Sequence, residues 1–351
     1  MTIARILDKL EQVRLSGIYS FGSEKHQFHL HPPLSEETVR DFEAREAVRL
    51  PSGYRDFLLQ AGNGGAGPYY GLLKLEDWQA ASQDEEPGAL SRSCVLQPQI
   101  SGEQRGDTAG HDMWASSLDG TLTLVDQGCT FYALLVVTGR YCGRVVYVDI
   151  QGNYHPYFVR DPDFLSWYER WLDELLWRYD DFWFGFGLPG REEQLLEVLQ
   201  SGQAAPDLLC EAMTTLGRIP QLQPRTLAAM RSLLRHSRHA VRGQAAYLLG
   251  KNLALAAEDD VKVLLKDESD LVRRRALEAL AKFPGMAWEP MARAALNTET
   301  PELALQALSL LKNAGLLRPE DVSVLTSSRN AEVRRYGEWA ACELKPGGNT
   351  L

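Results

Sequence analysis

The sequence predicts two domains of different class, an α+β domain over residues 1–185 and an all-α helical solenoid over residues 186–351. Three observations predict this division. The chain of 351 residues exceeds the ~250–300 residues that one hydrophobic core usually supports. Residues 119–158 hold short apolar runs separated by tight turns, which are typical of an antiparallel sheet. The second half repeats one apolar pattern every 31, 31 and 30 residues, which is typical of stacked helical pairs.

Acidic residues are concentrated in the first domain. Residues 1–185 contain 27 Asp and Glu against 16 Lys and Arg, a net charge of −11, whereas residues 186–351 contain 20 against 21, a net charge of +1. An acidic field favours a basic protein partner and disfavours nucleic acid, although an acidic balance can also serve solubility alone.

The composition also bears on location and cofactors. No apolar run reaches the ~18 residues of a membrane span, and the first residues, MTIARILDKLEQVRL, lack the features of a signal peptide. We therefore expect a cytoplasmic protein without a membrane partner. The five cysteines lie far apart and form no C-x-x-C pair, so we expect reduced thiols, no metal and no cofactor.

The first elements are two predicted helices joined by a histidine-rich loop. The first helix has apolar residues at spacings of three and four, namely Ile3, Ile6, Leu7, Leu10 and Val13. The loop contains His26, His29 and His31, which invite a metal site, but it supplies no carboxylate or thiolate at a helical spacing. The second helix is predicted to begin after Ser35, a suitable N-cap.

A glycine-rich turn lies within the stretch Leu50–Trp78, after a short helix for which Ser52 is the predicted N-cap and which should stop at Gly62 and Asn63. Glycine accepts positive φ and close approach of another backbone. We therefore assign a structural role to Gly62, Asn63, Gly64, Gly65, Gly67, Pro68 and Gly71. Aromatic rings are enriched at binding hot spots and acids attract basic partners. The expected partner-binding residues are Tyr69, Tyr70, Glu76, Asp77 and Trp78.

A short strand is predicted at Leu72–Leu75, followed by an irregular segment over residues 76–117. Asp107, His111 and Asp112 in that segment form either a polar cluster or part of a solvated loop. An antiparallel meander should follow, with strands at Thr121–Asp126, Thr130–Thr138, Arg144–Ile150 and Tyr154–Val159. The next helix should begin with Asp161 as its cap and Pro162 in its first position, and cover one face of the sheet.

The aromatic segment Trp177–Pro189 ends the first domain, and it suits a hydrophobic plug against the second domain better than a ligand cage. In the second domain, the repeated pattern V-R-x-x-A-x-x-x-L places Arg242, Arg273 and Arg334 at equivalent positions, whereas the third copy has Ala304 there. We expect these arginines to pair with acids of adjacent repeats, such as Asp270 or Glu332, rather than to form a ladder for a ligand.

The stretches LPSGYRDFLL and GNGGAGPYYGLL resemble the signature of the SUKH superfamily, the Smi/Knr-type domain. The similarity extends to DGTLTLVDQGC, LLVVTGRYCGRVVYVD and DFLSWYERWLDEL. This resemblance implies an α+β domain that binds other proteins, in bacteria commonly a secreted toxin, and that is not itself an enzyme. The second half is similar to HEAT-type repeats of the short bacterial kind.

Catalytic motifs are absent from the sequence. It contains no G-x-S-x-G and no H-E-x-x-H, and the glycine turn lacks both the lysine and the element order of a phosphate-binding loop. The leading hypothesis is therefore a non-enzymatic immunity-type protein, whose first domain binds and occludes a basic toxin. The alternative is a scaffold or regulator that binds partners through its HEAT-like repeats.

Overall fold

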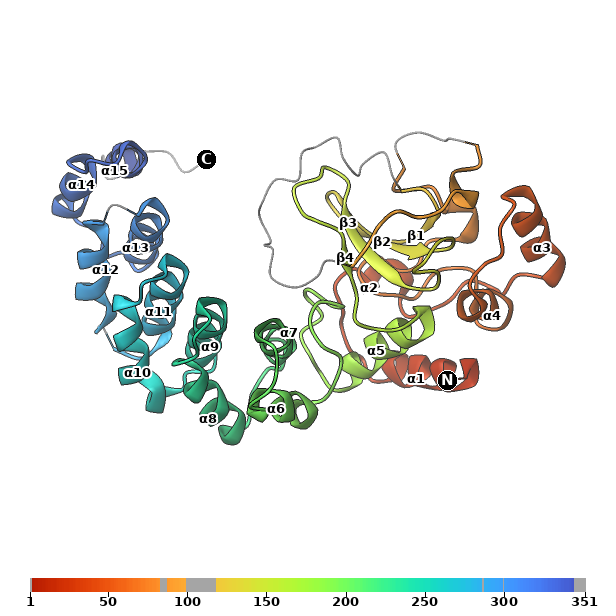
Figure 1. Cartoon of the computed structure of the whole chain (residues 1–351), viewed down its shortest axis with the longest axis horizontal. Helices are drawn as coiled ribbons and strands as arrows, with labels where there is room; N and C mark the ends of the chain where they lie inside the picture. The colour runs from red at the N-terminus through yellow and green to blue at the C-terminus, as the bar shows by residue number, and fades with distance from the viewer. Residues whose placement is uncertain (1, 83–86, 99–117, 286, 299, 344–351) are drawn as a thin grey trace. The chain divides into compact units, whose positions relative to one another are not determined.

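The computed structural model describes residues 2–82, 87–98, 118–285, 287–298 and 300–343 (Figure 1). The chain forms two compact units. Met1–Pro189 and the short segment Arg218–Pro220 make up the first unit, and Gly190–Gly217 with Gln221–Leu351 make up the second. The first unit is α+β and the second is all helical, as the sequence predicts.

The sheet of the first unit is a four-stranded antiparallel meander in the order β1-β2-β3-β4. Its strands are β1 (Thr121–Gly128), β2 (Phe131–Val136), β3 (Val145–Asp149) and β4 (Tyr157–Phe158). Thr121 pairs with Val136, and irregularities between Thr123 and Val125 and between Asp126 and Gly128 interrupt the β1–β2 register. The predicted meander is therefore confirmed, but Leu72–Leu75 is not a strand, because Leu72 makes only isolated bridges to Gly65 and Val125.

Both faces of the sheet are buried. Alternate residues of β2 and β3 point to opposite sides, and each side faces a hydrophobic core. Ala133, Leu135 and Tyr147 belong to the larger core, which also contains the helices. Leu134 and Val146 face a smaller core, which is covered by the residues Ala81, Cys94 and Leu96. The described residues of the segment after the glycine turn thus form part of this smaller core.

The helices of the first unit are α1 (Ile3–Leu15), α2 (Ser23–His26), α3 (Glu36–Arg45), α4 (Ser52–Gln60) and α5 (Phe164–Leu176), with 3-10 turns at Leu75–Asp77 and Ala89–Ser91. Helix α5 packs on the sheet, where Trp167 Nε1 donates to the hydroxyl of Tyr147 at 2.9 Å. Helix α1 packs on α5, and its Lys9 pairs with Glu169 at 2.7 Å. Figure 1 shows α1 and α5 side by side.

Two predicted helix caps need correction. The side chain that caps α5 is Asp163, which accepts from the backbone N–H of Ser166, whereas Asp161 is buried and pairs with Arg170. An Asp-Pro pair resembles a cap in the sequence, but Asp161 lies two residues before the observed cap, Asp163. Helix α4 begins at Ser52 itself, so Pro51 occupies the N-cap position without a side-chain bond. The cap at Ser35 is confirmed.

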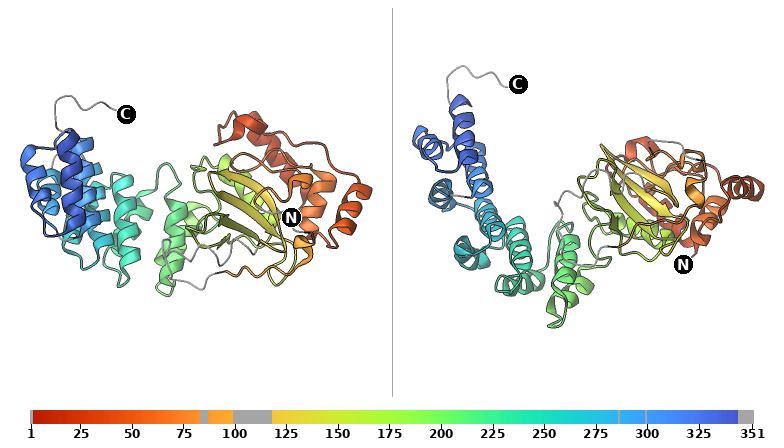
Figure 2. Two further views of the ribbon diagram at one scale, coloured as in Figure 1. Left: turned by 90° about the horizontal axis from the view of Figure 1, so that it is seen from above. Right: turned by 45° about the horizontal axis from the view of Figure 1, so that its top comes forward.

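The second unit consists of stacked helical pairs (Figures 1 and 2). The first helices of the pairs are α6 (Glu192–Gln200), α8 (Pro224–Leu233), α10 (Glu258–Val263), α12 (Trp288–Leu296) and α14 (Pro319–Thr326). The second helices are α7 (Pro206–Leu216), α9 (His239–Lys251), α11 (Asp270–Lys282), α13 (Pro301–Asn313) and α15 (Ala331–Glu343). Short 3-10 turns at Leu255–Ala257 and Leu264–Lys266 flank α10. The repeated apolar positions of α9, α11 and α13 are all buried, so these second helices bury their apolar stripe against their neighbours.

The repeated arginines hold the loop that precedes each second helix. Nη1 of Arg242, Arg273 and Arg334 each donates to the two carbonyl oxygens six and five residues earlier, at 2.6–3.1 Å. The expectation of acid partners holds only for Arg242, which forms a fork with Asp267 at 2.7 and 2.8 Å. Asp270 pairs with Arg273 of its own helix instead. Backbone carbonyls are therefore the shared partner, and these arginines serve the fold.

Candidate functional site

The glycine turn is buried from Gly62 to Pro68. Gly65 has φ +101°, and a Cβ at this position would overlap the carbonyl oxygen of His29. Gly65 exchanges two backbone hydrogen bonds of 2.8 Å with Leu72, so the turn folds back on the segment that follows it. Positive φ and this close approach of backbones are the two conditions that require glycine.

Asn63 joins the glycine turn to the next segment of chain. Its Oδ1 accepts from the N–H of Leu75 at 2.8 Å, and its Nδ2 donates to Glu76 at 3.0 Å. The bond from Asn63 lowers the pKa of the Glu76 carboxyl. Because Asn63 is buried and uses both ends of its amide, its contribution is structural.

Two of the predicted partner-binding residues point inward. The hydroxyl of Tyr69 donates to the carbonyl of Phe184 at 3.1 Å, and burial raises its pKa. Trp78 is 8% exposed and packs edge-on against Phe42, with ring centroids 6.3 Å apart. Glu76 and Asp77 are exposed and Tyr70 is partly exposed. Trp78 is therefore closed to a partner, whereas Tyr69 and Tyr70 are both partly exposed beside the two exposed acids.

Tyr70 forms an aromatic pair with Phe21, a residue far away in the sequence. The two ring centroids are 5.3 Å apart, and Nζ of Lys25 lies 3.8 Å from the Tyr70 centroid. Phe21 is 42% exposed. Gly128 lies beside the Tyr70 ring, because a Cβ there would come 3.3 Å from Cε2. The Phe21–Tyr70 pair is thus a positioned aromatic surface.

Asp181 connects this pair to the aromatic segment after α5. Its Oδ2 accepts from the N–H of Phe21 at 2.6 Å and from the hydroxyl of Ser20 at 2.5 Å. The next two residues, Phe182 and Trp183, are 59% and 48% exposed. Trp183 has φ +64°, which is uncommon for a bulky residue and is held only where the surroundings determine the conformation. Exposed aromatic rings therefore lie on both sides of Asp181.

The comparisons with known proteins identify the family of the first unit. Residues 33–170 match the model of the SMI1 / KNR4 family (SUKH-1). This part of the chain is a SUKH-1 domain. The matched residues include the glycine turn, all four strands and the first half of α5. Phe21 and Asp181 lie outside them, so the SUKH-1 domain supplies Tyr70 and the flanking segments supply its neighbours.

Other comparisons add little to this assignment. No curated protein matches the chain. Among solved structures, the chain is similar to an engineered protein from a structural genomics consortium, at 18% identity over 42% of this chain and 77% of that one, with a TM-score of 0.30. It is also similar to a designed armadillo repeat protein in complex with the peptide (KR)4, at 17% identity over 42% and 79%, with a TM-score of 0.30. No helix among the described residues could cross a membrane.

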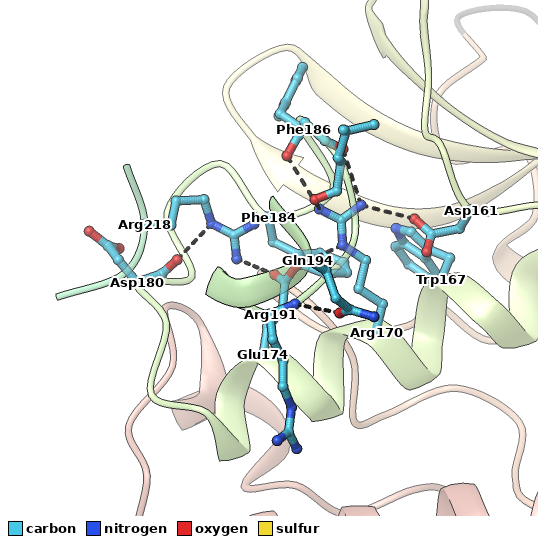
Figure 3. Close-up of polar contacts among 12 residues, drawn as sticks. Asp161, Trp167, Arg170, Glu174, Asp180, Phe184, Phe186, Arg191, Gln194 and Arg218 are labelled. Carbon is cyan, nitrogen blue, oxygen red and sulfur yellow. Dashed lines mark hydrogen bonds and ion pairs between the residues drawn. The ribbon is translucent and has the colours of Figure 1, made fainter. Parts of the chain in front are cut away.

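A buried network of four charges lies at the end of the SUKH-1 domain (Figure 3). Arg170 pairs with Asp161 at 3.1 Å and with Glu174 at 2.7 Å. Arg218 pairs with the other oxygen of Glu174, and its Nε donates to the carbonyl of Asp180 at 2.8 Å. All four side chains are at most 6% exposed, so two acids and two bases compensate each other in a buried site.

The network fixes the aromatic segment from within. Phe184 is 1% exposed, and the guanidinium carbons of Arg170 and Arg218 lie 5.7 and 5.8 Å from its ring centroid. Arg170 also donates to the carbonyls of Phe186 and Gly187, both at 3.4 Å. Phe184 and Phe186 therefore pack against the core of the first unit.

The histidines of the predicted loop do not converge. His26 is buried, its Nδ1 accepts from the N–H of Phe28 at 3.0 Å, and its ring packs edge-on against Trp171. Burial lowers the pKa of His26 to about 4. His29 and His31 are exposed. Within the described ranges, no group of three metal-ligating side chains comes together. Asp107, His111 and Asp112 lie outside the described residues.

Proposed function

We propose that this chain is a non-enzymatic immunity-type protein, whose SUKH-1 domain binds a basic toxin domain and occludes it. The observation that carries the proposal is the Phe21–Tyr70 pair, which presents two positioned aromatic rings at the surface of the glycine turn. Such rings contribute large contact area with little loss of side-chain entropy, and are enriched at binding hot spots.

Charge supports a basic partner for this domain. Residues 1–185 have a net charge of −11, and Glu76 and Asp77 are exposed next to the glycine turn. Acidic fields accelerate the encounter with a basic protein, while aromatic contacts slow its dissociation. In this proposal the chain inhibits the toxin by mass action. The bound SUKH-1 domain covers the toxin surface that the toxin's substrate would contact.

The test is binding of the purified full chain to the toxin domain encoded beside its gene, followed by titration calorimetry and by protection of cells that express the toxin. The Phe21→Ala, Tyr70→Ala double variant should lose about 2 kcal/mol of binding free energy, or about thirtyfold in affinity. The matched control is Tyr154→Ala, because Tyr154 is 46% exposed and its ring packs at a tilt against Phe131, with centroids 5.5 Å apart, as a second aromatic pair of the same unit.

Two results would contradict the proposal. One is that the wild type neither binds nor neutralises the neighbouring toxin. The other is that the Phe21–Tyr70 variant, shown to be folded by circular dichroism, binds as tightly as the Tyr154→Ala control. An Asp77→Lys variant tests the charge argument separately, because it should weaken binding further at low salt and much less at high salt.

The alternative function is a scaffold that binds partners through its HEAT-like repeats. It is favoured by exposed apolar side chains on the second unit, among them Trp339 at 46% and Leu305 at 36%. If substitutions at these two residues abolish partner binding while those at Phe21 and Tyr70 do not, the repeats carry the main interface.

A further inference from the structure

The second unit carries a group of cations on one face of α11 and the adjoining part of α9. Arg274, Arg275, Glu278 and Lys282 follow one another on α11 at spacings that place them on one face. The Arg275 guanidinium carbon lies 4.7 Å, and the Lys282 ammonium 5.0 Å, from the ring centroid of Tyr247 on α9. The cations of this face, here named the basic ridge, are Lys251, Arg274, Arg275 and Lys282.

The basic ridge has a surplus of positive charge. Its one acid, Glu278, is shared by Arg275 at 2.9 Å and by Lys282 at 3.8 Å. Among the described residues, Lys251 donates to a backbone carbonyl, that of Gly217, at 2.5 Å, and to no carboxylate. Arg274 forms no ion pair with any described residue, and its buried Nε has no hydrogen-bond partner among them. Four cations and one acid leave three charges uncompensated.

The cations of the neighbouring first helices are neutralised, in contrast. Arg231 of α8 and Arg235, which lies just after that helix, share Asp260, at 2.5 and 3.0 Å. Lys262 of α10 pairs with Glu258 at 2.8 Å and with Asp259 at 3.3 Å. The uncompensated charge therefore lies on the second-helix side of these repeats, in a domain whose net charge is only +1.

We propose that the basic ridge binds an acidic, extended segment of a partner protein. Guanidinium groups form paired hydrogen bonds with carboxylates, and cations already placed over an aromatic ring lose less freedom on binding. Charge complementarity therefore selects aspartate and glutamate side chains. This site is independent of the basic partner proposed for the SUKH-1 domain.

Nucleic acid fits the ridge less well. Proteins that bind it tightly often make about six to ten phosphate contacts, and the ridge offers four cations beside an acid. Bases also stack on open aromatic faces, whereas the Tyr247 ring already carries Arg275 and Lys282. A carboxylate-bearing segment needs neither feature.

The test uses the full chain and a fluorescein-labelled peptide of alternating glutamate and glycine, followed by fluorescence anisotropy. We expect saturable binding that the Arg275→Ala, Lys282→Ala double variant weakens at least about tenfold. The variant removes the two cations that would pair with carboxylates of the peptide. The matched control is Arg225→Ala, Arg235→Ala, which removes the same charge from two exposed arginines, one in α8 and one just after it. This control should change the affinity by less than about twofold.

A charge reversal keeps the test decisive. The Arg275→Glu, Lys282→Glu variant should bind the corresponding lysine–glycine peptide and reject the acidic one. The proposal is overturned if the wild type does not bind the acidic peptide, or if both double alanine variants lose it equally. It is also overturned if a poly-dT oligonucleotide binds the ridge more tightly than the peptide. Self-association of the chain that the ridge substitutions abolish would likewise overturn it, because the occupant is then a second copy.

Discussion

The two units hold their loops in opposite ways. In the second unit, an arginine recurs at equivalent positions of several repeats. Its side chain donates to backbone carbonyls five and six residues earlier in the chain. In the described part of the first unit, the contacts that hold the loops join positions far apart in the sequence. Arg218 binds Glu174 from 44 positions away, Asp181 holds Phe21 from 160 positions away, and Tyr69 reaches Phe184 across 115 positions.

This difference teaches where function can be placed on each unit. A periodic structure repeats one surface, so a binding site arises where a copy departs from the rest, as at the basic ridge. A structure built from distant contacts can bring unrelated segments to one point, as at Phe21 and Tyr70. The comparison predicts that single substitutions in the first unit act on residues far apart in the sequence, whereas those in the second act on neighbouring helices.

The largest expected effect comes from Glu174→Ala. The substitution leaves Arg218 buried without its carboxylate and the network with one excess positive charge. Breaking a buried ion pair in this way costs about 3–5 kcal/mol of unfolding free energy. Hydrogen exchange followed by mass spectrometry should show faster exchange throughout β1–β3 and α5, with little change in α11 and α13.

Asp173→Ala is the control, because Asp173 is the preceding residue of α5 but pairs with the partly exposed Lys9. It should cost less than about 1 kcal/mol. If Glu174→Ala accelerates exchange equally in both units, the proposed contrast between them is wrong.

An intermediate effect is expected from pH, through His26. Burial lowers the pKa of His26 to about 4, from the ordinary value of about 6.5. The unfolded chain therefore binds a proton on this side chain between these two values while the folded chain does not, and stability falls as pH falls through that window. The shift in pKa corresponds to about 3 kcal/mol of unfolding free energy. All of it is lost only when the pH falls to about 4, the pKa of His26 in the folded chain.

The measurement is urea unfolding of the wild type and of His26→Gln, followed by tryptophan fluorescence at about pH 7 and about pH 4.5. Acid also protonates carboxylates, and the comparison with the glutamine variant removes their common contribution. The wild type should lose about 2 kcal/mol more than the variant across this range. Equal losses would show that His26 does not remain neutral in the folded state.

The sequence revealed what local pattern determines. The 31-residue period, the antiparallel meander, the cap at Ser35 and the structural role of Asn63 all depend on contacts between residues close in sequence or on alternation within strands. Phe21, Asp181 and Arg218 were missed, because their partners lie 38 to 161 positions away and no period links them. Trp78 looked like a surface aromatic, and the bond from the Tyr69 hydroxyl to Phe184 was not expected, for the same reason, since both depend on distant segments.

The smallest expected effect tests how closely the repeats approach. Gly250 lies where α9 crosses α11, and a Cβ there would come within 2.5 Å of Ala279 Cβ. Gly243 lies on the same helix, but its Cβ would stay 3.7 Å from Leu271 and Arg275, which is ordinary contact. Alanine normally stabilises a helix interior by about 0.5–1 kcal/mol relative to glycine. We therefore expect Gly243→Ala to stabilise the second unit by that amount.

Gly250→Ala should have the opposite sign. The helices must separate to admit the methyl group, and such overpacking costs about 1–3 kcal/mol, which exceeds the gain in helix propensity. Hydrogen exchange should then rise in α9 and α11, their immediate neighbours should change less, and the first unit should not change. Destabilisation that spreads equally over α7 to α15 would show that the repeats unfold as one cooperative block. The contrast between local and distant contacts would then hold for the folded structure of the second unit but not for its stability.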